Sequence, residues 1–520
     1  MADPYYPTLV ERELARRRKV TRPLFLTLLA LIVFLFVVLI IAIVGAVSIL
    51  RETTPSYADP EEHFKYGSIG AEPTSGIPKK LWLALPYLFK DSFQGRKDYE
   101  AFGFLYEEKN GERLQLPIGI AQRRYRGVDL VWFNCATCHV GTVRESEGAA
   151  RRIVAGMPSN NLRLETFISF ILSAAYSEKL SGDAVFEAIR ESGQRLGPLE
   201  KLYWRFLVLP RLREELIVRA SRLRPLLEDQ PPWGPGRVDT FNPYKVIQLN
   251  VPLADLTVEE RIGASDFPAI FLQGAKAGMN LHWDGNNASL AERNLSAAIG
   301  AGVTPETVDH AAIGRIAYWL QDLEPPKSPL GVKADSETMD RGRAIYMDAC
   351  ADCHGYRDNE GRYVFEGEVL GEVEPADRID TDRGRLDSYT EAFRDRQLNE
   401  LFAGTPYQFR HFRKTDGYAN MPLDGLWLRG PYLHNGSVPT LADLLLPPSE
   451  RPVRFLRASD VVDAERGGFL SPPCEAGGLE PDGRFCFDTE APGNGNGGHA
   501  YGTTLGAAER SALLQYLMTF

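Results

Sequence analysis

The chain has 520 residues, of which 25% are charged and 44% hydrophobic, and its net charge at pH 7 is −10. This length suffices for two or three domains with their own cores, and the composition is that of a globular protein and not of a disordered one. The acidic balance argues against a nucleic-acid partner, because a phosphate-binding surface needs clustered Lys and Arg.

The first 50 residues have the pattern of a membrane anchor. Residues 1–22 end in a run rich in Arg and Lys, and residues 23–50 carry no charge. As a helix the apolar segment would be roughly 42 Å long, enough to cross a bilayer. A cleaved signal peptide is the competing interpretation, but its apolar core is usually only about 7–15 residues. The positive-inside rule then predicts a single-pass protein of the bacterial inner membrane, with a cytoplasmic N-terminus and the bulk of the chain in the periplasm.

Two later motifs, "CATCH" and "CADCH", share one spacing. In each, two cysteines separated by two residues are followed directly by a histidine. This is the pattern of c-type haem attachment, in which both thiols bond to the haem and the histidine becomes the proximal iron ligand. The sequence therefore predicts two covalently bound haems c, held by Cys135, Cys138, Cys350 and Cys353, with His139 and His354 as proximal ligands.

A redox-active cysteine pair and a zinc site fit these motifs less well. A thioredoxin-like redox pair needs a βαβ setting, which the surrounding sequence does not indicate. A zinc site could combine both cysteine pairs, but zinc gives no reason for a histidine directly after the second cysteine each time.

Residues 201–227 alternate Leu, Val and Arg at helical spacing. We expect a core helix with a basic outer face here, in preference to a helix lying on a membrane surface. Residues 320–337 are rich in Pro and polar residues and are the best candidate for a linker. A helix should follow this linker and lead into the second motif, as at the start of small cytochrome c domains.

The third cysteine pair, Cys474 and Cys486, lies in a Gly- and Pro-rich stretch without a nearby histidine. A structural disulfide is the simplest interpretation, since isolated thiols rarely persist in an exported chain. Residues 507–520 are apolar at helical spacing and should form a closing helix. The predicted fold is mainly α and loop-rich with few short strands, and its parts are a tail (1–22), an anchor (23–50), an N-terminal haem domain with insertions (51–325) and a C-terminal cytochrome c domain (326–520).

Several stretches resemble the bacterial di-haem cytochrome c peroxidase superfamily, and most of all its rubber oxygenase-like branch. They cover nearly all of the chain after the anchor and include "NCATCHVGTVR", "WGPGRVDTFNPYK", "LHWDGNNASLAERNLSAAIGAG", "PLDGLWLRGPYLHNGSVPTLADLL" and "PGNGNGGHAYGTTL". The resemblance implies that one haem is open to peroxide or dioxygen, while the other is six-coordinate and relays electrons. Trp283 matches a tryptophan between the two haems, which implies an electron relay, although a plain core residue would also fit this position.

The sixth ligand of the relay haem stays open at this stage. The methionine that the peroxidases often use, shortly after the "PYLHNGS" histidine, is absent. His499 on a Gly-rich loop is the first candidate, since the rubber oxygenase-like branch ligates with a late histidine. The superfamily histidine, His434, and Met421, which follows the second motif at the spacing of small cytochromes, are alternatives. A vacant sixth position is the remaining possibility.

The open haem would need a proton-moving group in order to split peroxide. Glu306 falls a few residues from the family's catalytic glutamate, but an exposed glutamate at a helix start is an equally good interpretation. An apolar pocket formed by residues 294–302 would instead suit an oxygenase. Arg429 occupies the position beside the superfamily's interhaem calcium, which makes a bound calcium doubtful.

These observations predict a di-haem oxidoreductase of the peroxidase type, with a reactive haem at His139 and an electron-relay haem at His354. Its electron donor would be a small cytochrome, a cupredoxin or a membrane quinol-oxidising complex, and peroxide or O₂ its small substrate. The alternatives are a pure electron-transfer cytochrome and an oxygenase that cleaves an apolar substrate. A distal carboxylate would favour the peroxidase, an apolar pocket the oxygenase, and a second strong ligand over the first haem electron transfer.

Overall fold

The computed structural model describes residues 8–330, 335–480 and 484–520. Parts of the predicted tail, of the linker and of the loop between the third cysteine pair lie outside the described residues. The chain divides into two compact units. The first comprises residues 1–53 with residues 124–129, and the second comprises residues 54–123 with residues 130–520.

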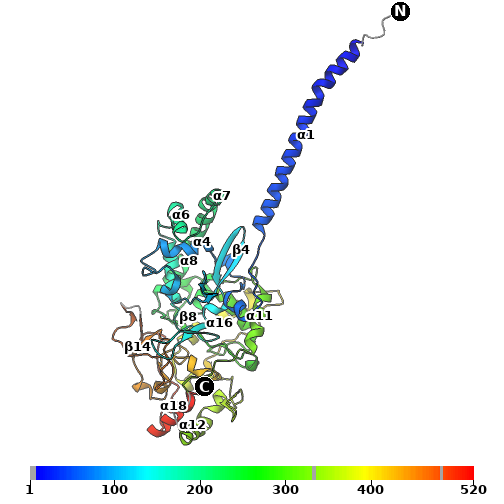
Figure 1. Ribbon diagram of the computed structural model, residues 1–520. Helices are drawn as coiled ribbons and strands as arrows, with labels where there is room; N and C mark the ends of the chain where they lie inside the picture. Colours follow the sequence, from blue (N-terminus) through cyan, green and yellow to red (C-terminus); the bar gives the residue numbers. More distant parts are fainter. Residues whose placement is uncertain (1–7, 331–334, 481–483) are drawn as a thin grey trace, which may run out of the picture. The chain divides into compact units, whose positions relative to one another are not determined.

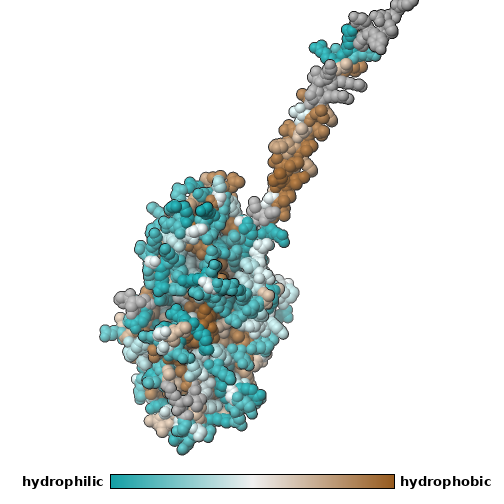
Figure 2. Space-filling model, in the orientation of Figure 1, coloured by the Kyte–Doolittle hydropathy of each residue, from teal (hydrophilic) through white to brown (hydrophobic). Residues whose placement is uncertain are grey.

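The first unit is dominated by one long helix, α1 (Leu9–Leu50) (Figure 1). Glu11 caps it by accepting a hydrogen bond of 2.9 Å from the Thr8 backbone N–H. Within it, Leu24–Gly45 is the one segment of the described residues that is both long and apolar enough to cross a membrane, and it is the brown helix of Figure 2. A helix of this kind near the N-terminus serves either as a membrane anchor or as a signal sequence.

The second unit is built mainly from short helices. About 41% of the chain is helical and 13% is strand, which confirms the prediction of a helix-rich, loop-rich fold. Its α-helices are α2 (Pro60–Tyr66), α3 (Glu72–Ser75), α4 (Lys79–Leu88), α5 (Leu164–Ala174), α6 (Gly182–Glu191), α7 (Pro198–Tyr203), α8 (Leu209–Glu228), α9 (Asn242–Ile247), α10 (Leu290–Gly300), α11 (His310–Gln321), α12 (Ser336–Ala349), α13 (Ala351–His354), α14 (Ala376–Ile379), α15 (Gly384–Ser388), α16 (Glu391–Glu400), α17 (Leu441–Leu444) and α18 (Ala507–Leu517).

The strands are short and form antiparallel pairs or three-stranded sheets among the described residues. The three-stranded sheets have the orders β1-β5-β4 and β14-β16-β15, and the pairs are β2-β3, β6-β7, β8-β9, β10-β11 and β12-β13. The strand bounds are β1 (Ile77–Pro78), β2 (Glu108–Lys109), β3 (Glu112–Arg113), β4 (Ile120–Tyr125), β5 (Val128–Phe133), β6 (Val140–Val143), β7 (Arg152–Ala155), β8 (Arg237–Asp239), β9 (Ala264–Asp266), β10 (Tyr356–Arg357), β11 (Tyr363–Val364), β12 (Val373–Pro375), β13 (Gly417–Ala419), β14 (Arg454–Arg457), β15 (Gly478–Leu479) and β16 (Phe485–Asp488).

Two helix pairs frame the haem motifs. The helix before the second motif, α12, packs against the closing helix α18, and both were predicted from the sequence (Figure 1). Gly342 makes this crossing possible, because a Cβ there would lie 2.2 Å from the Ala512 carbonyl oxygen. In the same way α2 packs against α11, with the Phe64 and Trp319 ring centroids 5.1 Å apart. Each proposed haem segment thus has a first and a last helix in contact, while the division at residue 325 stays a prediction.

The predicted helix over residues 201–227 is only partly a core helix. The core face of α8 is as expected, with Leu209, Leu212 and Leu216 buried. The preceding turns, α7 and the π-helical turn η3 (Trp204–Val208), are different, because most of their large apolar side chains are exposed. The apolar residues within 199–209 lie on all sides of the helix, so a single helix face can bury only some of them. Trp204 and Leu209 are the buried ones.

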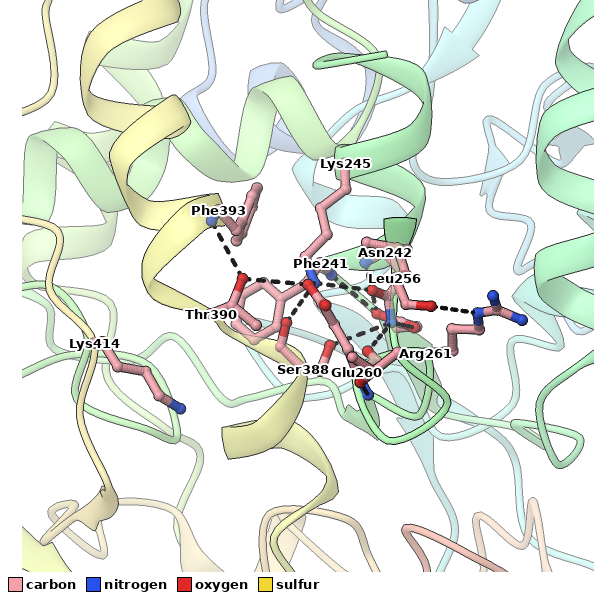
Figure 3. A network of polar contacts seen from close by, with 12 residues as sticks. Phe241, Asn242, Lys245, Leu256, Glu260, Arg261, Ser388, Thr390, Phe393 and Lys414 are labelled. Carbon is pink, nitrogen blue, oxygen red and sulfur yellow. Dashed lines mark hydrogen bonds and ion pairs between the residues drawn. The ribbon is translucent and has the colours of Figure 1, made fainter. Parts of the chain in front are cut away.

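A buried polar network ties the segment before the predicted linker to the segment after it (Figure 3). The Lys245 ammonium group on α9 donates to Glu260 Oε1 at 2.7 Å, to Asn242 Oδ1 at 3.1 Å and to the Ser388 carbonyl oxygen at 2.6 Å. Asn242 also donates to Ser388 Oγ at 3.2 Å. Lys245 is 1% exposed, so each of its protons needs such a partner inside the protein.

We predict that Lys245→Met destabilises the folded protein by about 3–5 kcal/mol, because it leaves the Glu260 carboxylate buried without its cation. The measurement is the free energy of unfolding of the purified protein in denaturant. Lys109→Met is the matched control, since Lys109 pairs with Glu62 at the exposed surface. Equal stability of the two variants would contradict the role assigned to the buried network.

Candidate haem sites

The first motif sits in a short turn that aims its histidine into the protein. The turn is the 3₁₀ segment η2 (Cys135–Thr137), and the Asn134 side chain caps it by accepting from the Ala136 backbone N–H at 3.0 Å. The next residue but one after η2 is His139, whose Nδ1–H donates to the Pro268 carbonyl oxygen at 3.0 Å. Burial lowers the pKa of His139 to about 4. The imidazole is therefore neutral at pH 7, with its proton on Nδ1 and a free lone pair on Nε2.

The second motif repeats this arrangement on different elements. It spans the end of α12 and the one-turn helix α13, and the His354 Nδ1–H donates to the Met421 carbonyl oxygen at 2.8 Å. Burial again lowers the pKa of His354. A backbone carbonyl on Nδ1 is the support that metal-ligating histidines usually have, since it fixes the tautomer and turns Nε2 toward the metal.

The four motif cysteines are free thiols in the structure, and their side chains are partly buried. Burial raises the pKa of Cys135 to about 11, and those of Cys138 and Cys350 to about 12. Low-pKa, exposed thiolates are the mark of redox-active pairs, and these cysteines have neither property. The arrangement therefore favours attachment of a cofactor over thiol–disulfide exchange.

His499 faces His354. Their ring centroids lie 6.1 Å apart, with 42° between the ring planes. An iron bound by one imidazole nitrogen on each side, at about 2 Å each, would place the two ring centroids roughly 6 Å apart. Burial lowers the pKa of His499 to about 3, so this imidazole is neutral as well. The two residues therefore fit a six-coordinate haem iron between them.

The loop that carries His499 is held by one buried arginine that the sequence did not single out. The Arg451 guanidinium donates to the carbonyl oxygens of Asn496 at 2.6 Å, Gly498 at 2.8 Å and His499 at 3.3 Å. It also donates to the carbonyls of Leu444, the last residue of α17, and of Leu446. Gly498 has φ of +75°, and its position leaves no room for a Cβ against the Ile379 carbonyl. The loop is thus fixed by its backbone.

The two alternative ligands have other contacts. His434 is buried, stacks on Tyr418 with centroids 4.2 Å apart, and its Nε2 is 3.0 Å from the Tyr418 hydroxyl. Met421 accepts the His354 Nδ1–H through its backbone carbonyl, so its main chain supports this histidine.

Trp283 connects the backbone segments that support the two proximal histidines. Its indole N–H donates to the Asp266 carbonyl at 2.9 Å, two residues before Pro268. Its own carbonyl accepts from the Ala419 N–H at 2.8 Å, two residues before Met421. The half-buried indole packs against Ala376, Leu386 and Tyr418. Trp283 is thereby bonded to both segments at once.

A cation without a counter-charge lies near His139. Arg293 on α10 is close enough to His139, His282 and Lys276 to lower the pKa of each. Burial lowers the pKa of Arg293 itself to about 10. Within the described part of the chain its guanidinium makes no hydrogen bond or ion pair, whereas Lys276 is paired with Asp424 at 2.9 Å. A haem, which carries two carboxylates, would supply the missing negative charge.

Glu306 is exposed in the turn between α10 and α11. No hydrogen bond or ion pair holds its carboxylate among the described residues, and it shows no preorganisation for proton transfer. In the predicted apolar pocket segment, Leu295, Ala298 and Ile299 are buried in the core of the protein. These side chains are packed into core clusters of the protein.

Two further sequence predictions concern structural contacts. Cys474 and Cys486 form a disulfide, with Cα atoms 5.9 Å apart. At the predicted position of the superfamily calcium, Arg429 donates to Asp424 Oδ1 at 3.0 Å. Since Lys276 also binds this carboxylate, two protein cations already neutralise Asp424. A calcium ion there stays a doubtful prediction.

Comparison with known proteins finds a family match in the C-terminal part of the chain. Residues 417–456 match a protein family described as RoxA-like, cytochrome c-like. This segment includes Met421 and His434 and supports the rubber oxygenase-like branch of the resemblance. A cytochrome c-like domain implies a covalently bound haem c, and it indicates a haem cytochrome oxidoreductase.

Two proteins of Sinorhizobium fredii are similar over parts of their length. The uncharacterized protein y4iM is 29% identical over 242 residues, and the uncharacterized protein y4iJ is 40% identical over 111 residues. These alignments cover 41% and 20% of this chain, and 51% and 17% of the two relatives. The chain thus spans about half of one curated relative and less of the other.

We predict that Arg451→Gln loosens the His499 loop, because it removes the guanidinium that several loop carbonyls share. Hydrogen exchange of residues 494–501 should become at least tenfold faster, including the His499 N–H, which is bonded to the Ile379 carbonyl. Arg454→Gln is the control, since Arg454 pairs with acidic groups nearer the surface. Unchanged exchange in Arg451→Gln would contradict the positioning role.

Proposed function

We propose that this chain is a membrane-anchored, periplasm-facing di-haem c-type cytochrome oxidoreductase. The haem at His139 would be the reactive one, and the haem at His354 would relay electrons to it. The observation that carries the proposal is the difference between the two histidines. His354 has a second imidazole opposite it at iron-spanning distance, whereas no histidine ring faces His139 among the described residues.

The contacts of the remaining histidines are with residues other than His139. His63 contacts Arg315, His282 contacts Asn286, His310 stacks on Tyr407, His411 pairs with Glu292, and His434 pairs with Tyr418. A covalently held haem supplies one-electron chemistry and, where an axial position is free, a site for peroxide or O₂. The residues around His139 would have to provide the rest.

His499 is the sixth ligand that the contacts favour for the second haem. Its ring centroid lies 6.1 Å from that of His354, and Arg451 holds its loop through backbone carbonyls. The backbone carbonyl of Met421 already supports His354, and His434 would have to leave Tyr418. Two neutral imidazoles would keep this site closed to substrates and suited to electron transfer.

Trp283 is the residue through which we propose that the two haems communicate. Its hydrogen bonds join the segment behind His139 to the segment behind His354. This path consists of a side chain and short stretches of backbone that are already in contact. Packing alone would retain an aromatic ring here, but it would not require the indole N–H.

The choice between peroxide and O₂ rests on the surroundings of His139. A peroxidase needs an acid–base group near the bound substrate, and the exposed Glu306 is not preorganised for that task. The match to the RoxA-like family favours the second candidate, an oxygenase acting on an apolar substrate with O₂. The electron donor would be a small cytochrome, a cupredoxin or a quinol-oxidising membrane complex.

We predict two haems per chain and two kinds of ferric EPR signal from the oxidised full-length protein, one high-spin and one low-spin. His499→Ala should convert the low-spin signal to high-spin, because His354 would lose the facing imidazole. His434→Ala is the matched control and should keep the low-spin signal. Two low-spin signals in the wild type would point to a pure electron-transfer cytochrome, and a second signal unaffected by His499→Ala would contradict this ligand.

We also predict that Trp283→Phe slows electron transfer between the haems while leaving the haem content unchanged, because it keeps a ring and removes the indole N–H that binds Asp266. Stopped-flow absorption after rapid reduction of the second haem would measure this rate. Trp427→Phe is the control, since it loses a similar indole bond, of 3.0 Å, to the Pro326 carbonyl. Equal rates in both variants would exclude Trp283 from the path.

A further inference from the structure

The turns before α8 carry a cluster of exposed apolar side chains, which we name the α7 patch. It consists of Leu199 (82% exposed), Phe206 (68%), Leu207 (60%), Leu202 (54%) and Tyr203 (37%). A brown area in Figure 2 covers the position that α7 has in Figure 1. Large apolar residues are normally buried, and a contiguous exposed group of them marks a surface that binds something.

The patch is rigidly presented. Trp204, in the middle of these residues, is 3% exposed and packs into the largest core cluster together with Leu209 and Leu212. The buried Trp204 anchors the helix, and its apolar neighbours therefore have to point away from the core. The exposure thus belongs to the fold of this segment and does not come from a fraying helix end.

The segment that carries the α7 patch has more basic than acidic side chains, and three of its cations, Arg205, Arg211 and Arg224, are ion-paired with carboxylates. Residues 195–228 contain eight Lys and Arg but only four Glu, in a chain whose net charge is −10. Lys201 and Arg205 alternate with the patch residues on the same turns. Long cationic side chains next to exposed Leu and Phe are typical of helices that lie in the interface of an anionic bilayer, with the charges in the headgroup layer.

The tether to α1 limits where a bilayer can be. Only residues 51–59 separate α1 from α2, and nine extended residues span at most about 32 Å. If α1 is anchored, the second unit therefore has a membrane surface within reach at all times. A soluble partner or a second copy would have to compete with that surface for the α7 patch.

We propose that the α7 patch inserts into the interfacial layer of the bilayer that α1 crosses, and that the surrounding Lys and Arg bind anionic phospholipid headgroups. The proposal rests on the anchoring part of the proposed function and is independent of the haem chemistry. The second attachment point would hold the second unit at the bilayer independently of the linker that follows α1. The haem sites would then stay close to a membrane-bound electron donor or to an apolar substrate dissolved in the bilayer.

The test uses full-length haem-loaded protein in vesicles that contain phosphatidylglycerol. A specific protease site is inserted between the exposed residues Pro55 and Ser56, and the cut releases the second unit from α1. We expect the cut unit to stay with the vesicles when they are pelleted. For the variant Leu202→Ser/Phe206→Ser, the partition coefficient of the cut unit between vesicles and buffer should fall by about a hundredfold. Each large apolar side chain that inserts contributes roughly a factor of ten or more to this coefficient.

The matched control is Val258→Ser/Tyr318→Ser, which removes two exposed apolar side chains outside the α7 patch (68% and 74% exposed). This variant should stay bound like the wild type, and the absorption spectra of all variants should agree, which separates docking from haem chemistry. Release of the wild-type unit on cutting, or equal retention of all variants, would overturn the proposal. Two other results would also overturn it. One is that the wild-type protein forms a dimer in detergent and the patch variant does not; the other is that the mass of the mature protein lacks α1.

Discussion

The hydrogen bond from a histidine Nδ1–H to a backbone carbonyl is the constraint on which both candidate haem sites depend. A free imidazole exchanges its proton between two nitrogens and rotates, so a motif of two cysteines and a histidine does not by itself aim a ligand. Pro268 and Met421 remove this freedom for His139 and His354. Both carbonyls come from segments more than 60 residues away from the histidine they hold. Folding of the whole second unit is therefore a precondition for each site.

The same segments also connect the sites to each other. Asp266 precedes Pro268 by two residues, its carboxylate is paired with Arg457 at 2.9 Å, and its carbonyl accepts the indole N–H of Trp283. The residue after the tryptophan, Asp284, is paired with Arg385 at 2.9 Å, and both side chains are almost fully buried. Such buried pairs hold a residue in one position, because separating them would leave charges without partners. The position of Trp283 is thus fixed by two buried ion pairs, one at the residue that accepts its indole N–H and one at the residue that follows it.

The local parts of this architecture were predictable from the sequence, and the long-range parts were not. The haem motifs, the helix leading into the second motif and the closing helix follow from spacing and periodicity over fewer than 20 residues. His499 could be named as a candidate ligand, but its place opposite His354 depends on a loop more than 140 residues further along the chain. Arg451 had no sequence signal at all, since its role consists of contacts with backbone carbonyls. The same holds for the carbonyls of Pro268 and Met421.

Burial was the least predictable property of single residues. The periodicity of residues 201–227 correctly predicted the core face of α8, but the same rule failed for the turns before it, where apolar residues surround the helix. A catalytic role was predicted for Glu306 from its distance along the sequence to a motif, and such a distance does not indicate whether a side chain is exposed. Only the fold decides that this carboxylate lies at the surface.

The asymmetry between the two sites has a physical origin in charge. At His354 the neighbouring His499 is neutral, and the guanidinium of Arg451 is hydrogen-bonded to backbone carbonyls, so these surroundings would suit the proposed pair of histidine ligands. At His139 the half-buried Arg293 has no anion among the described residues, and that cation favours whatever negative charge enters the site. A haem carboxylate would satisfy it first. Any positive potential that remains at Arg293 would favour negative charge near His139, on the proposal that the haem held there is the reactive one. On the proposed function, the partner of His354 and the unneutralised charge near His139 would separate electron transfer from reactivity.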